Sequence, residues 1–165
     1  MAAYRRGKVH ELNLAELVAD LTQPRKTMDE TAMAELVASI KKVGVLEPIL
    51  FRVDRQGNKV VVAGERRVEA ARLAGLTVIP ALYVSGNHAE ISLIENLLRQ
   101  DLTPVEEAEG LQALLIEQQY TQEQLGEMIG KSQNSLSEML SLNRLPQEVR
   151  DETRGARHLG LERGG

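Results

Sequence analysis

Two adjacent arginines stand where a strand gives way to a helix. The run Val60-Val61-Val62-Ala63 predicts a buried strand, and Gly64 then turns the chain into an alanine-rich helix that begins at Glu65. Arg66 and Arg67 therefore fall in the first helical turn, where unpaired backbone N–H groups favour an anion and stability favours acidic side chains. The pattern indicates a phosphate site, or else two arginines that pair with carboxylates on a solvated face.

The composition limits which other chemistries the chain can support. There is no cysteine among the 165 residues, which excludes disulfides, thiolate catalysis and zinc–thiolate sites. His10, His88 and His158 lie too far apart for a histidine metal motif. The four aromatic residues are too few for a platform on which single-stranded nucleic acid stacks. No apolar run has the length of a membrane span and no signal peptide is visible, so we expect a cytoplasmic protein without a membrane partner.

Short apolar runs predict the strands of a small α/β unit. We expect strands at residues 10–17, 48–53, 59–63 and 78–84. Pro80 lacks a backbone donor, which favours an edge strand or the start of a strand at that place. The first eleven residues are polar and basic, and we expect them to be loosely held.

Helices are expected between and after these strands. A capping-box pattern begins at Thr27, apolar residues follow at helical spacing, and Gly44 ends the helix. A second helix is expected from Glu65 to Gly75. From residue 89 onward the pattern is helical throughout, with a break near Pro104, which suits the first position of a helix.

These patterns predict an α+β protein in two parts and a tail. The α/β domain is expected over residues 1–100 and an all-helical domain over residues 101–152. Residues 153–165 are rich in glycine and arginine and lack apolar periodicity, so we expect a disordered tail.

A pair of short helices at 122–129 and 133–140, with Gly130 between them, has the pattern of a helix-turn-helix. Its expected core residues are Leu125, Ile129, Leu136 and Met139, with the small Gly126 permitting close helix approach. The residues that would contact DNA are Lys131, Ser132, Gln133, Asn134, Ser135 and Arg144. Residues 101–165 hold 6 basic and 12 acidic side chains, so we expect weak DNA binding by this part alone. The alternative is a helix pair kept for packing or for docking a partner.

Five segments in register resemble the motifs of the ParB family of partition proteins, within the ParB/sulfiredoxin-like superfamily. The likeness runs from about Leu12 to Arg150. The similar segments are a Gln-Pro-Arg box at 22–26, a cytosine-recognition segment at 44–49, a first phosphate motif at 64–67 with 70–71, a second at 95–99, and the run 102–108 that precedes the helix-turn-helix. The resemblance implies a ParB/sulfiredoxin-like α/β domain followed by an all-helical domain.

The function that the resemblance implies is a CTP-dependent molecular switch acting in DNA partition. Family members bind and slowly hydrolyse CTP with Mg²⁺, and the nucleotide closes two subunits into a clamp that slides on DNA. Carried over by motif, Glu95 and Asn96 would hold Mg²⁺, and Glu65 with Glu95 would assist hydrolysis. The residues implied for nucleotide binding are Gly44, Glu47, Pro48, Ile49, Gly64, Glu65, Arg66, Arg67, Ala70, Glu95, Asn96 and Arg99.

The resemblance also implies partners. A second copy of the chain would be the partner in a nucleotide-dependent homodimer, and DNA would be loaded by the helix-turn-helix. A ParA-like ATPase could dock on the basic Arg5, Arg6 and Lys8, unless these belong to a solvated tail. Arg25 and Lys26 lie in a segment that could approach the nucleotide or the partner subunit.

The chain departs from the family pattern in three places. Glu47 stands where the family has glutamine, and although it can accept from the cytosine amino group it adds charge near a polyanion. The reading helix has Gln133, Glu138 and Ser141 where basic or amide residues are common. No folded segment is expected after Arg150 to serve as a C-terminal dimerisation domain. The alternative function is therefore a CTP-binding adaptor that has lost specific DNA recognition and links a ParA-type ATPase or a scaffold.

Two activities known elsewhere among such domains are disfavoured. The sulfiredoxin branch needs a reactive cysteine, which this chain lacks, and a nuclease would need a carboxylate cluster able to hold two metal ions. Glu95 and Arg99 also have the i, i+4 spacing of a plain helix-surface ion pair, which is the alternative to their role in binding nucleotide.

Overall fold

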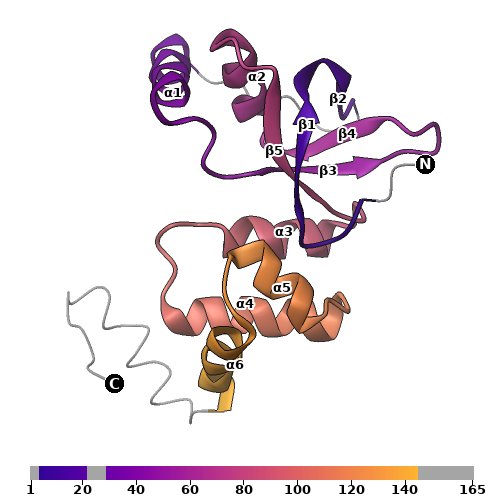
Figure 1. The fold of residues 1–165 in the computed structure, drawn as a ribbon, viewed down its shortest axis with the longest axis vertical. Helices are drawn as coiled ribbons and strands as arrows, with labels where there is room; N and C mark the ends of the chain where they lie inside the picture. Colours follow the sequence, from indigo (N-terminus) through magenta and orange to yellow (C-terminus); the bar gives the residue numbers. More distant parts are fainter. Residues whose placement is uncertain (1–3, 22–28, 145–165) are drawn as a thin grey trace. The chain divides into compact units, whose positions relative to one another are not determined.

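The computed structural model describes residues 4–21 and 29–144 of the chain. It forms two compact units, Met1–Ile91 and Ser92–Gly165. The first unit is a mixed sheet with two helices, and the second is helical, so the expected α+β class is confirmed (Figure 1).

Five strands make one sheet in the first unit. They are β1 (Val9–Asn13), β2 (Leu17–Ala19), β3 (Ile49–Val53), β4 (Lys59–Ala63) and β5 (Val78–Tyr83), in the order β1-β5-β3-β4-β2. The β5–β3 and β4–β2 pairs are parallel, and the other two are antiparallel. The single strand expected at 10–17 is in fact two strands on opposite edges of the sheet. A 3-10 turn at Leu14–Glu16, capped by the Asn13 side chain, separates them.

The strand that contains Pro80 is not at an edge, so that prediction was wrong. β5 lies between β1 and β3, and Pro80 is its third residue. The pairing of β5 with β3 begins at Ala81, so Pro80 has no pairing partner in β3. A missing donor is tolerated in an interior strand where one neighbouring strand has already ended.

Two helices pack together in the first unit. They are α1 (Glu30–Val43) and α2 (Glu65–Leu73). Asp29, rather than Thr27, is the N-cap of α1, and its carboxylate accepts from the Ala32 amide at 2.7 Å. Thr27 lies outside the described residues. Gly44 ends α1 with φ of 78°, as expected. The core of this unit is built around Ile49, Phe51, Val61, Val68, Ala71 and Ile79.

Residues 4–11 are held against the sheet, contrary to the expectation of a loose segment. The Tyr4 ring meets Phe51 edge-on at 5.1 Å between centroids, and Arg6 forms a β-bridge with Tyr83. The Arg6 guanidinium lies 3.1 Å from a carboxylate oxygen of Glu90, whose side chain is 0% exposed. The other Glu90 oxygen accepts from the Ser85 amide at 2.6 Å. A buried ion pair therefore anchors the N-terminal segment.

The helical part contains α3 (His88–Leu97), α4 (Pro104–Glu117), α5 (Gln122–Ile129) and α6 (Gln133–Ser141), then a 3-10 turn at Leu142–Arg144. The division between the two units falls inside α3. Thr103 and Thr121 cap α4 and α5 with complete capping boxes, and Pro104 opens α4 as expected. No helix in the described ranges is long and apolar enough to cross a membrane.

The expected helix-turn-helix is present in α5 and α6. Leu125 and Leu136 are fully buried, whereas Ile129 and Met139 are only half-buried. Gly126 serves the turn and not helix-to-helix contact, because a Cβ there would lie 2.9 Å from the backbone oxygen of Lys131. Gly130 adopts the left-handed conformation that ends α5.

Candidate functional site

The N-terminus of α2 is built on a glycine that no other residue could replace without strain. Gly64 has φ of 95°, in the left-handed region, and a Cβ there would lie 2.7 Å from Cγ2 of the fully buried Ile49. No side chain caps this helix, whose first backbone hydrogen bond runs from the Val68 amide to the Gly64 oxygen. The amides of residues 65–67 are therefore available to an anion.

Arg67 makes contacts that the sequence did not predict. Its Nη1 atom donates to the backbone oxygens of Glu47 at 2.9 Å and Pro48 at 2.7 Å, and lies 4.0 Å from the Glu47 carboxylate. The guanidinium is thus a tether between the first turn of α2 and the segment 44–49. The structure brings these two predicted segments together within the first unit.

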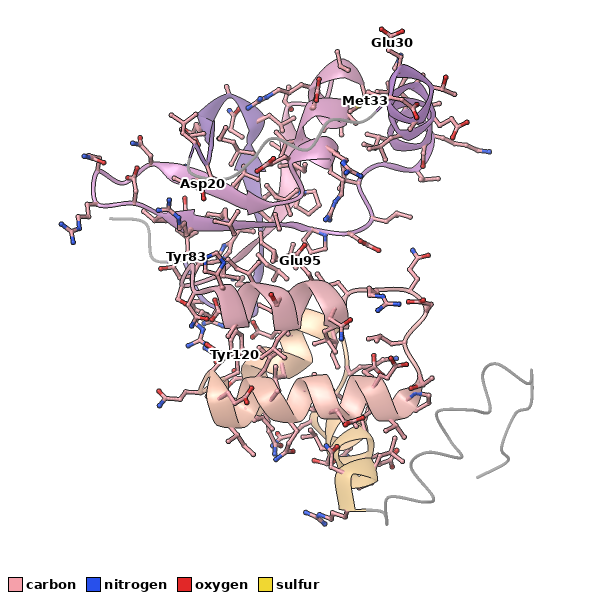
Figure 2. The ribbon with its side chains drawn as sticks, turned by 180° about the vertical axis from the view of Figure 1, so that it is seen from behind. Asp20, Glu30, Met33, Tyr83, Glu95 and Tyr120 are labelled. Atoms are coloured by element: carbon pink, nitrogen blue, oxygen red, sulfur yellow. The ribbon has the colours of Figure 1, made fainter. Side chains whose placement is uncertain are left out.

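Arg66, next to Arg67 on α2, is exposed. With Glu65 and Arg72 it lines a hollow of about 580 Å³ between α2 and the end of β2. Arg72, which the sequence reasoning missed, donates to the Leu14 backbone oxygen at 2.9 Å and so holds α2 against the 3-10 turn. Asp20, which follows β2 (Figure 2), also lines the hollow. The segment 22–26 begins two residues after Asp20 in the sequence. Arg25 and Lys26 lie outside the described residues.

Two of the predicted binding residues have fully buried side chains. Ile49 and Ala70 are both 0% exposed, so neither side chain can contact a ligand in this conformation. Gly44 and Pro48 are half-buried and shape the segment that Arg67 holds. Among the predicted binding residues of the first unit, the Arg66 side chain is exposed and those of Glu47 and Glu65 are half-buried.

The second predicted phosphate segment lies in the second unit. Glu95 and Asn96 are exposed on α3, which ends at Leu97, two residues before Arg99. Arg99 therefore does not pair with Glu95, and instead donates through Nε and Nη2 to Asp101 at 3.1 and 2.9 Å. The Asp101 carboxylate, by hydrogen bond and charge, raises the pKa of Arg99 above its ordinary value. Arg99 also donates to the Asn96 side chain at 3.2 Å.

Metal binding by the protein alone finds no support in the part of the chain that the structure describes. There, no three histidine, aspartate or glutamate side chains are grouped so that they could hold an ion. Mg²⁺ commonly takes one or two carboxylates and completes its shell with water and phosphate oxygens. Glu95 and Asn96 therefore stay predicted ligands of an ion that would arrive with its anion.

The candidate DNA surface is polar with acidic neighbours. Ser132 is the N-cap of α6, and its Oγ accepts from the Ser135 amide at 3.1 Å. Gln133 and Asn134 are exposed in the first turn of α6. The exposed charged side chains of α5, α6 and the turns next to them are the basic Lys131 and Arg144 and the acidic Glu123, Glu127 and Glu138.

Comparison with known proteins matches both units. The family model for the ParB N-terminal domain matches residues 2–97, and that for the ParB helix-turn-helix domain matches residues 100–158. Stage 0 sporulation protein J of Bacillus subtilis is 42% identical over 144 residues, which are 86% of this chain and 51% of that protein. The nucleoid occlusion protein of Geobacillus thermodenitrificans is 38% identical over 149 residues, 88% of this chain and 53% of that protein.

Among solved structures, a C-terminally truncated chromosome-partitioning protein ParB from Caulobacter crescentus, complexed with CTP-γ-S, is similar. It is 35% identical, with a TM-score of 0.48 over 90% of this chain and 86% of that one. The chain spans about half the length of the curated relatives it matches.

Proposed function

We propose, from the premise that this chain belongs to the ParB family of chromosome-partitioning proteins, that it is a CTP-dependent switch. The chain binds CTP with Mg²⁺, the nucleotide drives self-dimerisation, and slow hydrolysis reverses it. One observation carries the proposal: Arg67 ties the segment that resembles the cytosine-recognition motif to the helix start that resembles the phosphate motif. A base and a triphosphate joined by one ribose need both segments close together.

The residues at the start of α2 fit a phosphate group. Gly64 leaves a place where a Cβ would otherwise stand, the amides of residues 65–67 are uncapped, and the Arg66 side chain is exposed beside them. Guanidinium forks bind phosphate oxygens in pairs. The Glu47 carboxylate could accept from the exocyclic amino group of cytosine, a donor that uracil replaces with an acceptor oxygen.

The negative charge of a bound triphosphate is the reason that the proposal includes a divalent ion and further arginines. The hollow beside α2 is lined by Arg66 and Arg72, but also by Asp20, Glu65 and Glu69. A bound triphosphate therefore needs more positive charge, which Mg²⁺ supplies when present. Arg99 stays a proposed ligand of the triphosphate, and binding phosphate would require it to give up its ion pair with Asp101. Nucleotide would then favour the state in which that ion pair is broken. Glu65 and Glu95 stay the proposed groups that assist hydrolysis.

The test is a titration of the full chain with the four nucleoside triphosphates in the presence of Mg²⁺. We expect CTP to bind more tightly than ATP, GTP and UTP. We expect Arg66→Ala to weaken CTP binding at least about tenfold, the worth of one charge-assisted hydrogen bond. Arg55→Ala is the matched control, because Arg55 is exposed in the turn between β3 and β4 and should leave the CTP affinity unchanged. Equal affinity for ATP and CTP would overturn the proposal.

The acidic surface of α5 and α6 favours a second candidate. Glu123 and Glu127 are exposed on α5 and Glu138 is exposed on α6, while the first turn of α6 offers DNA only amide and hydroxyl side chains. Because neutralised phosphates supply most non-specific DNA affinity, such a surface suits an adaptor that keeps the CTP switch and links a ParA-type ATPase or a scaffold. Any docking of that ATPase on the N-terminal segment would involve the basic residues Arg5, Arg6 and Lys8, of which Arg6 also pairs with Glu90.

Binding to duplex DNA at several salt concentrations separates the two candidates. For the partition role we expect the logarithm of the affinity to fall steeply with the logarithm of salt concentration, and one sequence to be preferred. Lys131→Ala should then reduce that slope by about 1. Weak binding with a nearly flat salt response and no preferred sequence would support the adaptor.

A further inference from the structure

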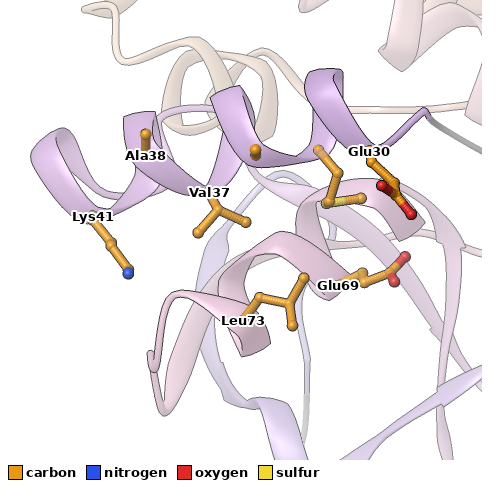
Figure 3. Close-up of a pocket in the computed structure, with 8 residues that line it drawn as sticks. Glu30, Val37, Ala38, Lys41, Glu69 and Leu73 are labelled. Carbon is orange, nitrogen blue, oxygen red and sulfur yellow. The ribbon is translucent and has the colours of Figure 1, made fainter.

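A groove between α1 and α2 is left unused by the proposed function. Its volume is about 540 Å³, and its apolar lining includes Met33 together with Val37 and Leu73, which face one another in Figure 3. Leu73 is 60% exposed, although it is a large apolar residue. On the α1 side, the groove is bordered by the small exposed residues Ala34 and Ala38. An apolar surface of this kind is suited to burial by another helix.

The two ends of the groove carry opposite charges. Glu30 and Glu69 lie at the end where α1 begins, and Lys41 lies at the end where α1 finishes (Figure 3). Within residues 4–21 and 29–144, none of these three side chains has a hydrogen bond or an ion pair. Glu30 and Glu69 therefore make one end of the groove negative, and Lys41 makes the other end positive.

We propose that a second copy of the chain docks in this groove, with the two α1 helices antiparallel. A two-fold axis beside the middle of α1 places Glu30 of one copy opposite Lys41 of the second copy, and Ala34 opposite Val37. A two-fold contact requires that the same patch be complementary to itself. The groove satisfies this, because acid and base lie about equally far from the middle of α1.

The side chains in the middle of the groove suit a close helix pair. Ala34 and Ala38, one turn apart, let two helix axes approach closely, and the ridges of one helix can enter the grooves of the other. Val37 and Leu73 would then lose contact with water in both copies. This contact needs no nucleotide, so it is distinct from the nucleotide-driven dimer proposed above.

The test is sedimentation velocity of the full chain without nucleotide, over a wide range of protein concentrations. We expect the wild-type chain to self-associate reversibly. Glu30→Lys and Lys41→Glu should each weaken this association about tenfold, because each reversal puts like charges together at two symmetric places. An equimolar mixture of the two variants should associate as the wild type does, since every facing pair is then again one acid and one base.

The matched controls lie on the same helix but outside the groove. Glu35→Lys and Lys42→Glu make the same charge changes at exposed positions and should leave the association unchanged. Ala38→Arg should prevent close helix approach and abolish association, whereas Ser39→Arg should not, and thermal unfolding checks that both variants fold. A wild-type chain that stays monomeric at every concentration, or a mixture that associates no better than either variant alone, would overturn the proposal. Neither result bears on CTP binding.

Discussion

We expect Gly64→Ala to lower the free energy of unfolding by about 3 kcal/mol and to abolish CTP binding. A side chain at φ of 95° costs about 1–2 kcal/mol, and overpacking against a buried residue costs a similar amount. The new Cβ would lie 2.7 Å from Cγ2 of Ile49, which is fully buried and has no space to move into. The start of α2 must then shift, together with the amides proposed for phosphate. Urea unfolding measures the first effect and nucleotide titration the second.

Gly75→Ala separates the cost of a side chain at positive φ from the cost of overpacking against a buried neighbour. Gly75 has φ of 83°, but a Cβ there would meet no atom within 4 Å. The Gly75→Ala variant should therefore lose only the free energy of unfolding that a positive φ costs a side chain, about 1 kcal/mol, and should keep its CTP affinity. If the two variants were equally destabilised, the close approach of Gly64 to Ile49 would have no energetic consequence. The expectation that a side chain at position 64 shifts the start of α2 would then be wrong.

Arg6→Met should be nearly as costly, with a loss of about 2–3 kcal/mol of unfolding free energy. The substitution leaves the Glu90 carboxylate, which is 0% exposed, without the guanidinium that lies 3.1 Å away. The cost is placed below that of a fully buried pair because the Arg6 side chain is 26% exposed. The start of α3 should also become more mobile, which amide hydrogen exchange of residues 88–91 would report.

Two further variants test this reading. Lys8→Met removes a positive charge from an exposed position of the same segment and should change stability by less than about 0.5 kcal/mol. Arg6→Met combined with Glu90→Leu should recover much of the lost stability, because no buried charge is then left unpaired. A double variant that is as unstable as the sum of its parts would show that packing, and not charge, accounts for the loss.

Features with a local cause were predictable from sequence. Gly44 and Gly130 each end a helix with a positive φ, and Pro104 opens a helix. Each depends on a few neighbouring residues, so the amino-acid pattern contains the whole reason. The first turn of α2 after Gly64 and the helix-turn-helix were recognised on the same basis, as was the resemblance to the ParB family.

Features with a distant cause were not predictable. Pro80 lies in an interior strand, because strand order depends on which segments far apart in sequence pair with one another. The run at 10–17 splits between two edges of the sheet for the same reason. The Arg6–Glu90 pair joins residues 84 positions apart, and neither residue type signals burial in the sequence.

The contrast between local and distant causes also applies to Arg66 and Arg67 in the candidate site. The amino-acid order alone places two arginines in the first turn of a helix beside a glycine, because strand, turn and helix signals are local. It is the packing of distant segments that lets Arg67 contact Glu47 and Pro48 while Arg66 stays exposed. Neighbours on a helix point about 100° apart, so which one meets another segment depends on where folding has placed that segment.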